Sequence, residues 1–123
     1  MYIIGADHPN KGLAQEMLEK LAASRQRLVT DAEVFQEILH RYTAIQRLDA
    51  IDPAFALLRS IVDEVFSIDM LVVEGAKAIL HQSQFLSARD ALHVAVMKTH
   101  GVSKILSFDK GFDSVPGIDR IPA

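Results

Sequence analysis

The stretch SARDALHVAVMKTHGVSKILSFDKGFD occupies residues 87–113 and combines a helix, a strand and several acidic side chains. Ser87 is a favourable N-cap, and Gly101 is a favourable stop for a helix over 88–100. This helix is apolar on nearly every face, which only a helix buried on several sides tolerates. Residues 104–108 then read as a strand. The stretch therefore predicts a buried helix that leads into a strand of the same core.

Upstream of this stretch, segments with helical and strand periodicity alternate. Residues 27–30 read as a short strand, and Thr30 with Glu33 forms a capping box for a helix that continues to Tyr42. The other expected elements are helices over 11–23, from Asp52–Pro53 onward and over 73–84, and strands over 65–68 and 118–121. Strands that alternate with helices imply a parallel sheet with helices on both faces. We expect a single α/β domain over residues 1–123.

Composition excludes several classes of protein. The chain has 123 residues, of which 50% are hydrophobic and 24% charged, as in ordinary globular domains. No segment approaches the roughly 18 apolar residues of a membrane span, so no membrane contact is expected. Without cysteine, disulfides and thiolate sites are excluded, which fits the cytoplasm. The net charge of −3 means that any nucleic acid must be bound by local Arg and Lys.

Three carboxylates stand where an α/β fold gathers its ligands: Glu37, Asp90 and Asp109 lie near expected strand ends or helix starts. If they share one cleft they repel one another, because two charges about 4 Å apart interact by about 4 kcal/mol at a dielectric of about 20. A divalent cation between them removes this repulsion. The pattern therefore predicts a metal site with oxygen ligands.

Each carboxylate also has a simpler interpretation. Glu37 could be a solvated helix residue, and Glu33, one turn earlier, could serve the helix cap. Asp90 could be only the partner of the Ser87 cap, favoured by the helix dipole. Asp109 precedes Lys110 and glycine and could be a turn former.

Histidines offer a rival metal site, since His40, His81, His93 and His100 all fall on expected helices. None forms the helical zinc-hydrolase motif with two histidines, and no phosphate-binding glycine loop or serine-hydrolase motif occurs. His93, amid apolar neighbours, is expected to be a hydrogen-bonded core residue. A response-regulator receiver also clusters acids at strand ends, but its phosphoacceptor Asp and late Lys have no convincing counterparts.

Residues 88–95 and 105–113 resemble the C-terminal half of a PIN domain, the metal-dependent ribonuclease fold of VapBC-type toxins, and residues 30–42 resemble its Glu-bearing helix. The resemblance implies a PIN-like three-layer α/β/α sandwich with a parallel central sheet. It implies Mg²⁺ or Mn²⁺ held by carboxylates and hydrolysis of RNA phosphodiesters. Three of the family's four acidic positions match catalytic, metal-binding residues here: Glu37, Asp90 and Asp109. Asp113 is an acidic neighbour that ranks below them.

The resemblance also implies partners. VapC-type toxins are restrained by a cognate antitoxin and form homodimers through helices, so both are expected for this chain. Ser107 could hold a carboxylate or a metal-bound water, while Arg89 and Lys110 could contact RNA phosphate. The alternative function is a catalytically impaired PIN-like module that binds an antitoxin or itself.

The beginning of the chain departs from the family pattern. PIN domains open with an apolar strand that ends in Asp, whereas residues 1–9 resemble the end of the helix that follows. We therefore expect the first strand and the first catalytic Asp to be absent, with Met1 placed downstream of the true start. The competing interpretation is that residues 2–4 form the strand and that Asp7 substitutes for the missing acid.

Overall fold

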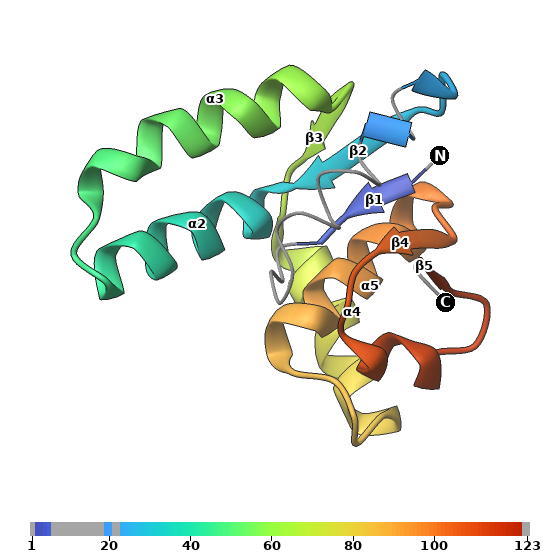
Figure 1. Ribbon diagram of the computed structural model, residues 1–123. Helices are drawn as coiled ribbons and strands as arrows, with labels where there is room; N and C mark the ends of the chain where they lie inside the picture. Colours follow the sequence, from blue (N-terminus) through green and yellow to red (C-terminus); the bar gives the residue numbers. More distant parts are fainter. Residues whose placement is uncertain (1, 6–18, 21–22, 122–123) are drawn as a thin grey trace.

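The computed structural model describes residues 2–5, 19–20 and 23–121, and five parallel strands form its central sheet in the order β3-β2-β1-β4-β5 (Figure 1). The strands are β1 (Tyr2–Ile4), β2 (Leu28–Asp31), β3 (Glu64–Phe66), β4 (Lys104–Leu106) and β5 (Asp119–Ile121). All four strand pairs are parallel, as the alternation of strands and helices predicted. The parallel α/β fold class is therefore confirmed.

The described helices fall into two groups. One group is α2 (Ala32–Ala44) and α3 (Ile51–Ile61), joined through a short 3₁₀ turn over Leu48–Ala50; the other is α4 (Met70–Gln82) and α5 (Ala88–His100). Figure 1 shows α4 and α5 packed together beside the sheet, while α2 and α3 form a hairpin that projects from it. Among the described residues, no helix is long and apolar enough to cross a membrane.

The core lies between the middle of the sheet and α5. Every residue of β2 is buried, as are Ile3 of β1 and Ile105 of β4. Helix α5 buries Ala91 and all of 93–97, which confirms the helix expected to be covered on several sides. Its ends also agree with the sequence, because Ser87 accepts a hydrogen bond from the N–H of Asp90 and Gly101 adopts a left-handed conformation with φ of 68°.

Residues 2–4, which were expected to belong to the end of a helix, form a strand instead. Tyr2–Ile4 forms β1, which lies between β2 and β4 at the centre of the sheet. Its side chains suit this place, since Ile3 is 0% and Ile4 is 6% exposed. Asp7, the substitute acid of the competing interpretation, lies outside the described residues, as does most of the helix expected over 11–23.

The capping box of Thr30 and Glu33 is also corrected. Thr30 belongs to β2, and its hydroxyl donates to the carbonyl of Ile4 in the neighbouring strand at 3.0 Å. Asp31 caps α2 instead, with its Oδ1 accepting from the N–H of Val34 at 3.2 Å. The strand therefore continues one residue further than the local pattern indicated, because pairing with β1 engages the threonine.

Two glycine-to-alanine changes should have opposite effects on stability. Gly101→Ala forces an L-residue into the left-handed region and should lower the free energy of unfolding by about 1 kcal/mol. Gly75→Ala lies within α4, where the added Cβ would meet Cβ of Ala95 at an ordinary 3.5 Å. It should be neutral or raise the free energy of unfolding by up to about 1 kcal/mol. Urea unfolding measures both, and equal effects would contradict the assigned helix ends.

Candidate metal and nuclease site

Parallel pairing brings the ends of β1, β2 and β4 to one edge of the sheet, marked by Ile4, Asp31 and Leu106, which we call the carboxyl edge. Helix α2 begins there directly after Asp31, and the chain that leaves β4 reaches Asp109 within three residues. In open α/β sheets, this is the edge at which ligands bind.

Asp90, in the first turn of α5, and Asp109, beyond β4, interact through a hydrogen bond between their side chains. Burial, together with the hydrogen bond to Asp109 and its negative charge, raises the pKa of Asp90 to about 7. The same hydrogen bond, the N–H of Gly111 and the charge of Arg120 lower the pKa of Asp109. The two groups therefore titrate as a pair in which Asp90 holds its proton more tightly than Asp109 does.

The loop that carries Asp109 is held by short local contacts. The backbone N–H of Asp109 donates to Oγ of Ser107 at 3.0 Å, and Oδ1 of Asp109 accepts from the N–H of Gly111 at 2.8 Å. A Cβ at residue 111 would lie only 2.7 Å from the carbonyl oxygen of Phe85, so this close approach requires glycine. Ser107, itself buried, thus fixes the backbone next to the carboxylate.

A buried hydrogen bond joins the end of β2 to α5. Oδ2 of Asp31 lies 2.6 Å from Nδ1 of His93, and the two side chains are 0% and 3% exposed. Because a carboxylate only accepts, Nδ1 carries a proton and donates it. The expectation that His93 is a hydrogen-bonded core histidine is therefore confirmed.

Glu37 lies on the other side of the same imidazole. Its Oε1 is 3.5 Å from Nε2 of His93. Burial lowers the pKa of His93, but its contacts with Asp31 and Glu37 and their charges outweigh this and raise the pKa to about 10. At neutral pH the imidazole is therefore a cation between two carboxylates.

Glu33, one turn before Glu37 on α2, belongs to the same acidic surroundings. Burial and the charge of Glu37 raise the pKa of Glu33, whereas the charges of His93 and Arg89 lower it. Glu33 thus faces the carboxyl edge instead of closing a cap with Thr30. Arg89, expected to contact phosphate, is exposed and brings positive charge close to these acids.

The three predicted ligands are brought together only in part. Asp90 and Asp109 are in direct contact, whereas Glu37 is linked to them through His93, whose charge also lowers the pKa of Asp90. Within the described ranges, no three acidic or histidine side chains gather closely enough to enclose a metal ion. The structure therefore offers a pair of carboxyl groups with a third carboxylate beside it.

Sequence reasoning missed Asp31 and Arg120. The guanidinium of Arg120 pairs with both carboxylate oxygens of Asp113, at 3.0 and 3.2 Å, and donates to the carbonyl of Ser107 at 3.4 Å. Asp113 is thus engaged in an ion pair, consistent with its lower rank. Asp31 could have been found from its position, as a short acidic residue between an apolar strand and a helix is a favourable N-cap.

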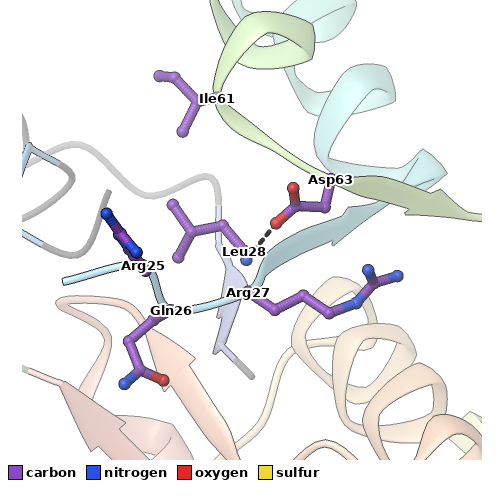
Figure 2. Close-up of a pocket in the computed structure, with 6 residues that line it drawn as sticks. All are labelled: Arg25, Gln26, Arg27, Leu28, Ile61 and Asp63. Atoms are coloured by element: carbon purple, nitrogen blue, oxygen red, sulfur yellow. Dashed lines mark hydrogen bonds between the residues drawn. The ribbon is translucent and has the colours of Figure 1, made fainter. Parts of the chain in front are cut away.

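A surface hollow lies at the opposite edge of the sheet. Figure 2 shows its lining by Arg25, Gln26, Arg27, Leu28, Ile61 and Asp63. The carboxylate of Asp63 accepts from the N–H of Leu28 at 3.0 Å, which ties the starts of β2 and β3 together. This hollow is separate from the carboxyl edge and contains none of the predicted ligands.

Comparison with known proteins agrees with this arrangement. The PIN domain family model matches residues 1–118, and the chain belongs to the PIN-domain family. The chain is 54% identical over 121 residues to VapC ribonuclease Mb1869c of Mycobacterium bovis and to ribonuclease VapC13 of Mycobacterium tuberculosis, covering 98% of this chain and 92% of each relative. Ribonuclease VapC23 of Mycobacterium tuberculosis is 38% identical over 109 residues, covering 89% of this chain and 86% of that protein. Its curated relatives are thus VapC-type ribonucleases.

Solved structures share the fold at low sequence identity. VapC20 of Mycobacterium tuberculosis, a toxin described as cleaving the sarcin-ricin loop, superposes with a TM-score of 0.72 at 23% identity, covering 93% of this chain and 94% of that one. A chain of VapBC2 from Rickettsia felis, bound to a promoter DNA fragment, gives a TM-score of 0.73 at 11% identity, covering 97% and 96%. These likenesses confirm the PIN-like α/β/α architecture.

The pKa of Asp90 predicts how stability depends on pH without metal. Its ordinary value is 3.8 and its folded value about 7, so the folded state binds this proton more tightly. The free energy of unfolding should therefore fall as pH rises from about 4 to 7. Asp90→Asn should flatten this decline and be more stable than the wild type above pH 7. Thermal unfolding with chelator at several pH values tests it.

Asp119→Asn is the matched control, because Asp119 is an exposed carboxylate in β5. It should leave the decline of the wild type unchanged. A wild-type protein whose stability does not fall between pH 4 and 7 would contradict the close pairing of Asp90 with Asp109.

Proposed function

We propose that this protein is a metal-dependent endoribonuclease, the toxin of a VapBC-type toxin–antitoxin pair. Its catalytic residues are Glu37, Asp90 and Asp109, which also hold the metal ion. The main support is the interaction of Asp90 with Asp109 at the carboxyl edge, where the pKa of Asp90 is raised and that of Asp109 is lowered. The names of the curated relatives, all VapC ribonucleases, support the same reaction class.

The side chains present suit a hard cation. Mg²⁺ prefers oxygen ligands, keeps several waters and is commonly bound by one or two carboxylates together with substrate phosphate. The pair of Asp90 and Asp109 supplies such oxygens, and loss of the proton from Asp90 makes both side chains available as carboxylates. Glu37 adds a third carboxylate on the neighbouring helix. The donor set therefore fits Mg²⁺ or Mn²⁺ and has no soft ligand that favours other metals.

The protein groups have distinct tasks in hydrolysis. When bound, the metal supplies a Lewis acid that lowers the pKa of water and neutralises charge on the phosphate oxygens. Asp109, held by Ser107 and Gly111, presents its carboxylate in a fixed direction. Arg89 and Lys110 are exposed beside the acids, where their positive charges can bind RNA phosphates that the net charge of −3 would otherwise repel.

We also propose an antitoxin partner, a homodimer and a cytoplasmic location. The similar structures include a toxin–antitoxin complex from Klebsiella pneumoniae and VapBC2 from Rickettsia felis. On this chain, helix α4 and the turn after it expose large apolar side chains, among them Met70, Leu71 and Phe85 at 66%, 77% and 74%. Such side chains suit burial against a protein partner.

Removing the carboxylates should abolish RNA cleavage. Asp90→Asn, Asp109→Asn and Glu37→Gln are each expected to lower the cleavage rate by about 100-fold or more, because each removes a charge that holds the metal ion. Cleavage of labelled RNA with Mg²⁺ or Mn²⁺ measures this. Glu74→Gln, an exposed carboxylate on α4, is the control and should keep wild-type activity.

Two outcomes would count against this assignment. Equal activity of the wild type and the Asp90 variant would reveal a contaminating nuclease and discard the catalytic residues. An inactive wild type that still captures the product of a neighbouring short reading frame would favour the alternative, an impaired PIN-like interaction module.

Metal removal provides a separate test. Excess EDTA should stop cleavage, and added Mg²⁺ or Mn²⁺ should restore it, because the bound metal ion is what activates water for attack on the phosphate. The metal should also raise the melting temperature of the wild type, since a ligand bound only by the folded state stabilises it. Asp90→Asn should lose most of this increase. Cleavage that persists in EDTA would contradict metal dependence.

A further inference from the structure

Three buried or half-buried side chains form a continuous line from β2 to α2 through α5. Asp31 is 2.6 Å from Nδ1 of His93, and Nε2 of His93 is 3.5 Å from Oε1 of Glu37. The residues are contributed by three different elements, so their alignment depends on the packing of the whole domain. Asp31 is also fixed by the N–H of Val34, which occupies its other oxygen.

The imidazole of His93 forms a short hydrogen bond with Asp31 and a longer contact with Glu37. His93 is 2% exposed, and its Nε2 is the one buried side-chain nitrogen or oxygen in the described part of the chain without a hydrogen-bond partner. An unpaired buried polar atom costs free energy. The contact at 3.5 Å is longer than a good hydrogen bond. A small movement of the Glu37 carboxylate towards Nε2 would complete it.

Carboxylate ligands of metal ions are commonly oriented by hydrogen bonds from neighbouring groups. We infer that His93, held in place by Asp31, is a positioning residue that fixes one oxygen of Glu37 and turns the other towards the metal ion. Asp31 selects the ring orientation, and Nε2 of His93 restrains the carboxylate. This inference rests on the proposed function, and it assigns roles to two residues that are not themselves proposed as ligands.

Two substitutions at residue 93 separate the two contacts of the ring. His93→Gln places an amide N–H near the position of Nε2 and keeps a donor for Glu37. His93→Asn places its amide near the position of Nδ1 and keeps a donor for Asp31 only. His81→Asn, an exposed histidine on α4, is the control for a general effect of losing an imidazole.

Mn²⁺ binding, measured by calorimetry without RNA, is the decisive readout. His93→Asn should weaken Mn²⁺ binding by about 10- to 100-fold, and His93→Gln should weaken it clearly less. His81→Asn should bind Mn²⁺ with the affinity of the wild type. In a Glu37→Gln background, His93→Asn should cause no further loss, because the carboxylate that it positions is gone. A purely structural role for His93 predicts equal losses in both backgrounds.

The outcomes distinguish this inference from the proposed function. A wild type without Mn²⁺ affinity would overturn both. A wild type that binds Mn²⁺, with equal losses in the two His93 variants or an undiminished loss in the Glu37→Gln background, would overturn the positioning role alone.

Nuclear magnetic resonance of histidine labelled with ¹⁵N tests the geometry even if the His93 variants do not fold. Glu37→Gln should shift the Nε2 resonance of His93 and leave that of His81 unchanged. An Nε2 resonance of His93 that does not respond to this substitution would also overturn the inference.

Discussion

The hydrogen bond between Asp31 and His93 is the contact on which the carboxyl edge depends. It is almost completely buried and joins residues 62 positions apart in the sequence. Removing one partner of such a pair leaves an uncompensated charge in the core, at a cost of about 3–5 kcal/mol. Because Asp31 also caps α2, the same bond sets where that helix begins relative to α5. The helix that carries Glu37 and the helix that carries Asp90 are thereby held together.

The acidic groups at this edge need internal compensation. The carboxylates around His93 come from β2, α2 and α5, and the imidazolium is their buried counter-charge. Next to the pair, the Arg120 guanidinium forms an ion pair with Asp113, and its charge contributes to lowering the pKa of Asp109. Burial and the neighbouring Asp109 outweigh the charge of His93 at Asp90, so Asp90 keeps its proton up to about pH 7. A divalent metal ion that displaces the proton of Asp90 would neutralise the carboxylate in its place.

Local signals in the sequence predicted the structure well where a few neighbouring residues decide it. Helix α5 begins after Ser87, which accepts from the N–H of Asp90, and ends at Gly101, as expected. These ends could be predicted because capping uses atoms within one turn of the helix. The prediction that Thr30 caps the helix was wrong, because its hydroxyl donates to the carbonyl of Ile4 in β1 and not to the helix. Residues 2–4 were expected to be helical, because three apolar residues suit a helix as well as a strand. In the structure they pair with β2 on one side and β4 on the other, and this pairing makes them a strand.

By itself, the sequence determined a parallel α/β fold with a buried helix over 88–100 and acidic residues near the ends of its elements, because periodicity and caps are properties of adjacent residues. Only the tertiary structure decided which of these acids touch. It paired Asp90 with Asp109, placed Glu37 beside His93 and buried Asp31 beneath them. Such contacts join residues distant in the chain, and their geometry exists only once the strands have paired and the helices have packed.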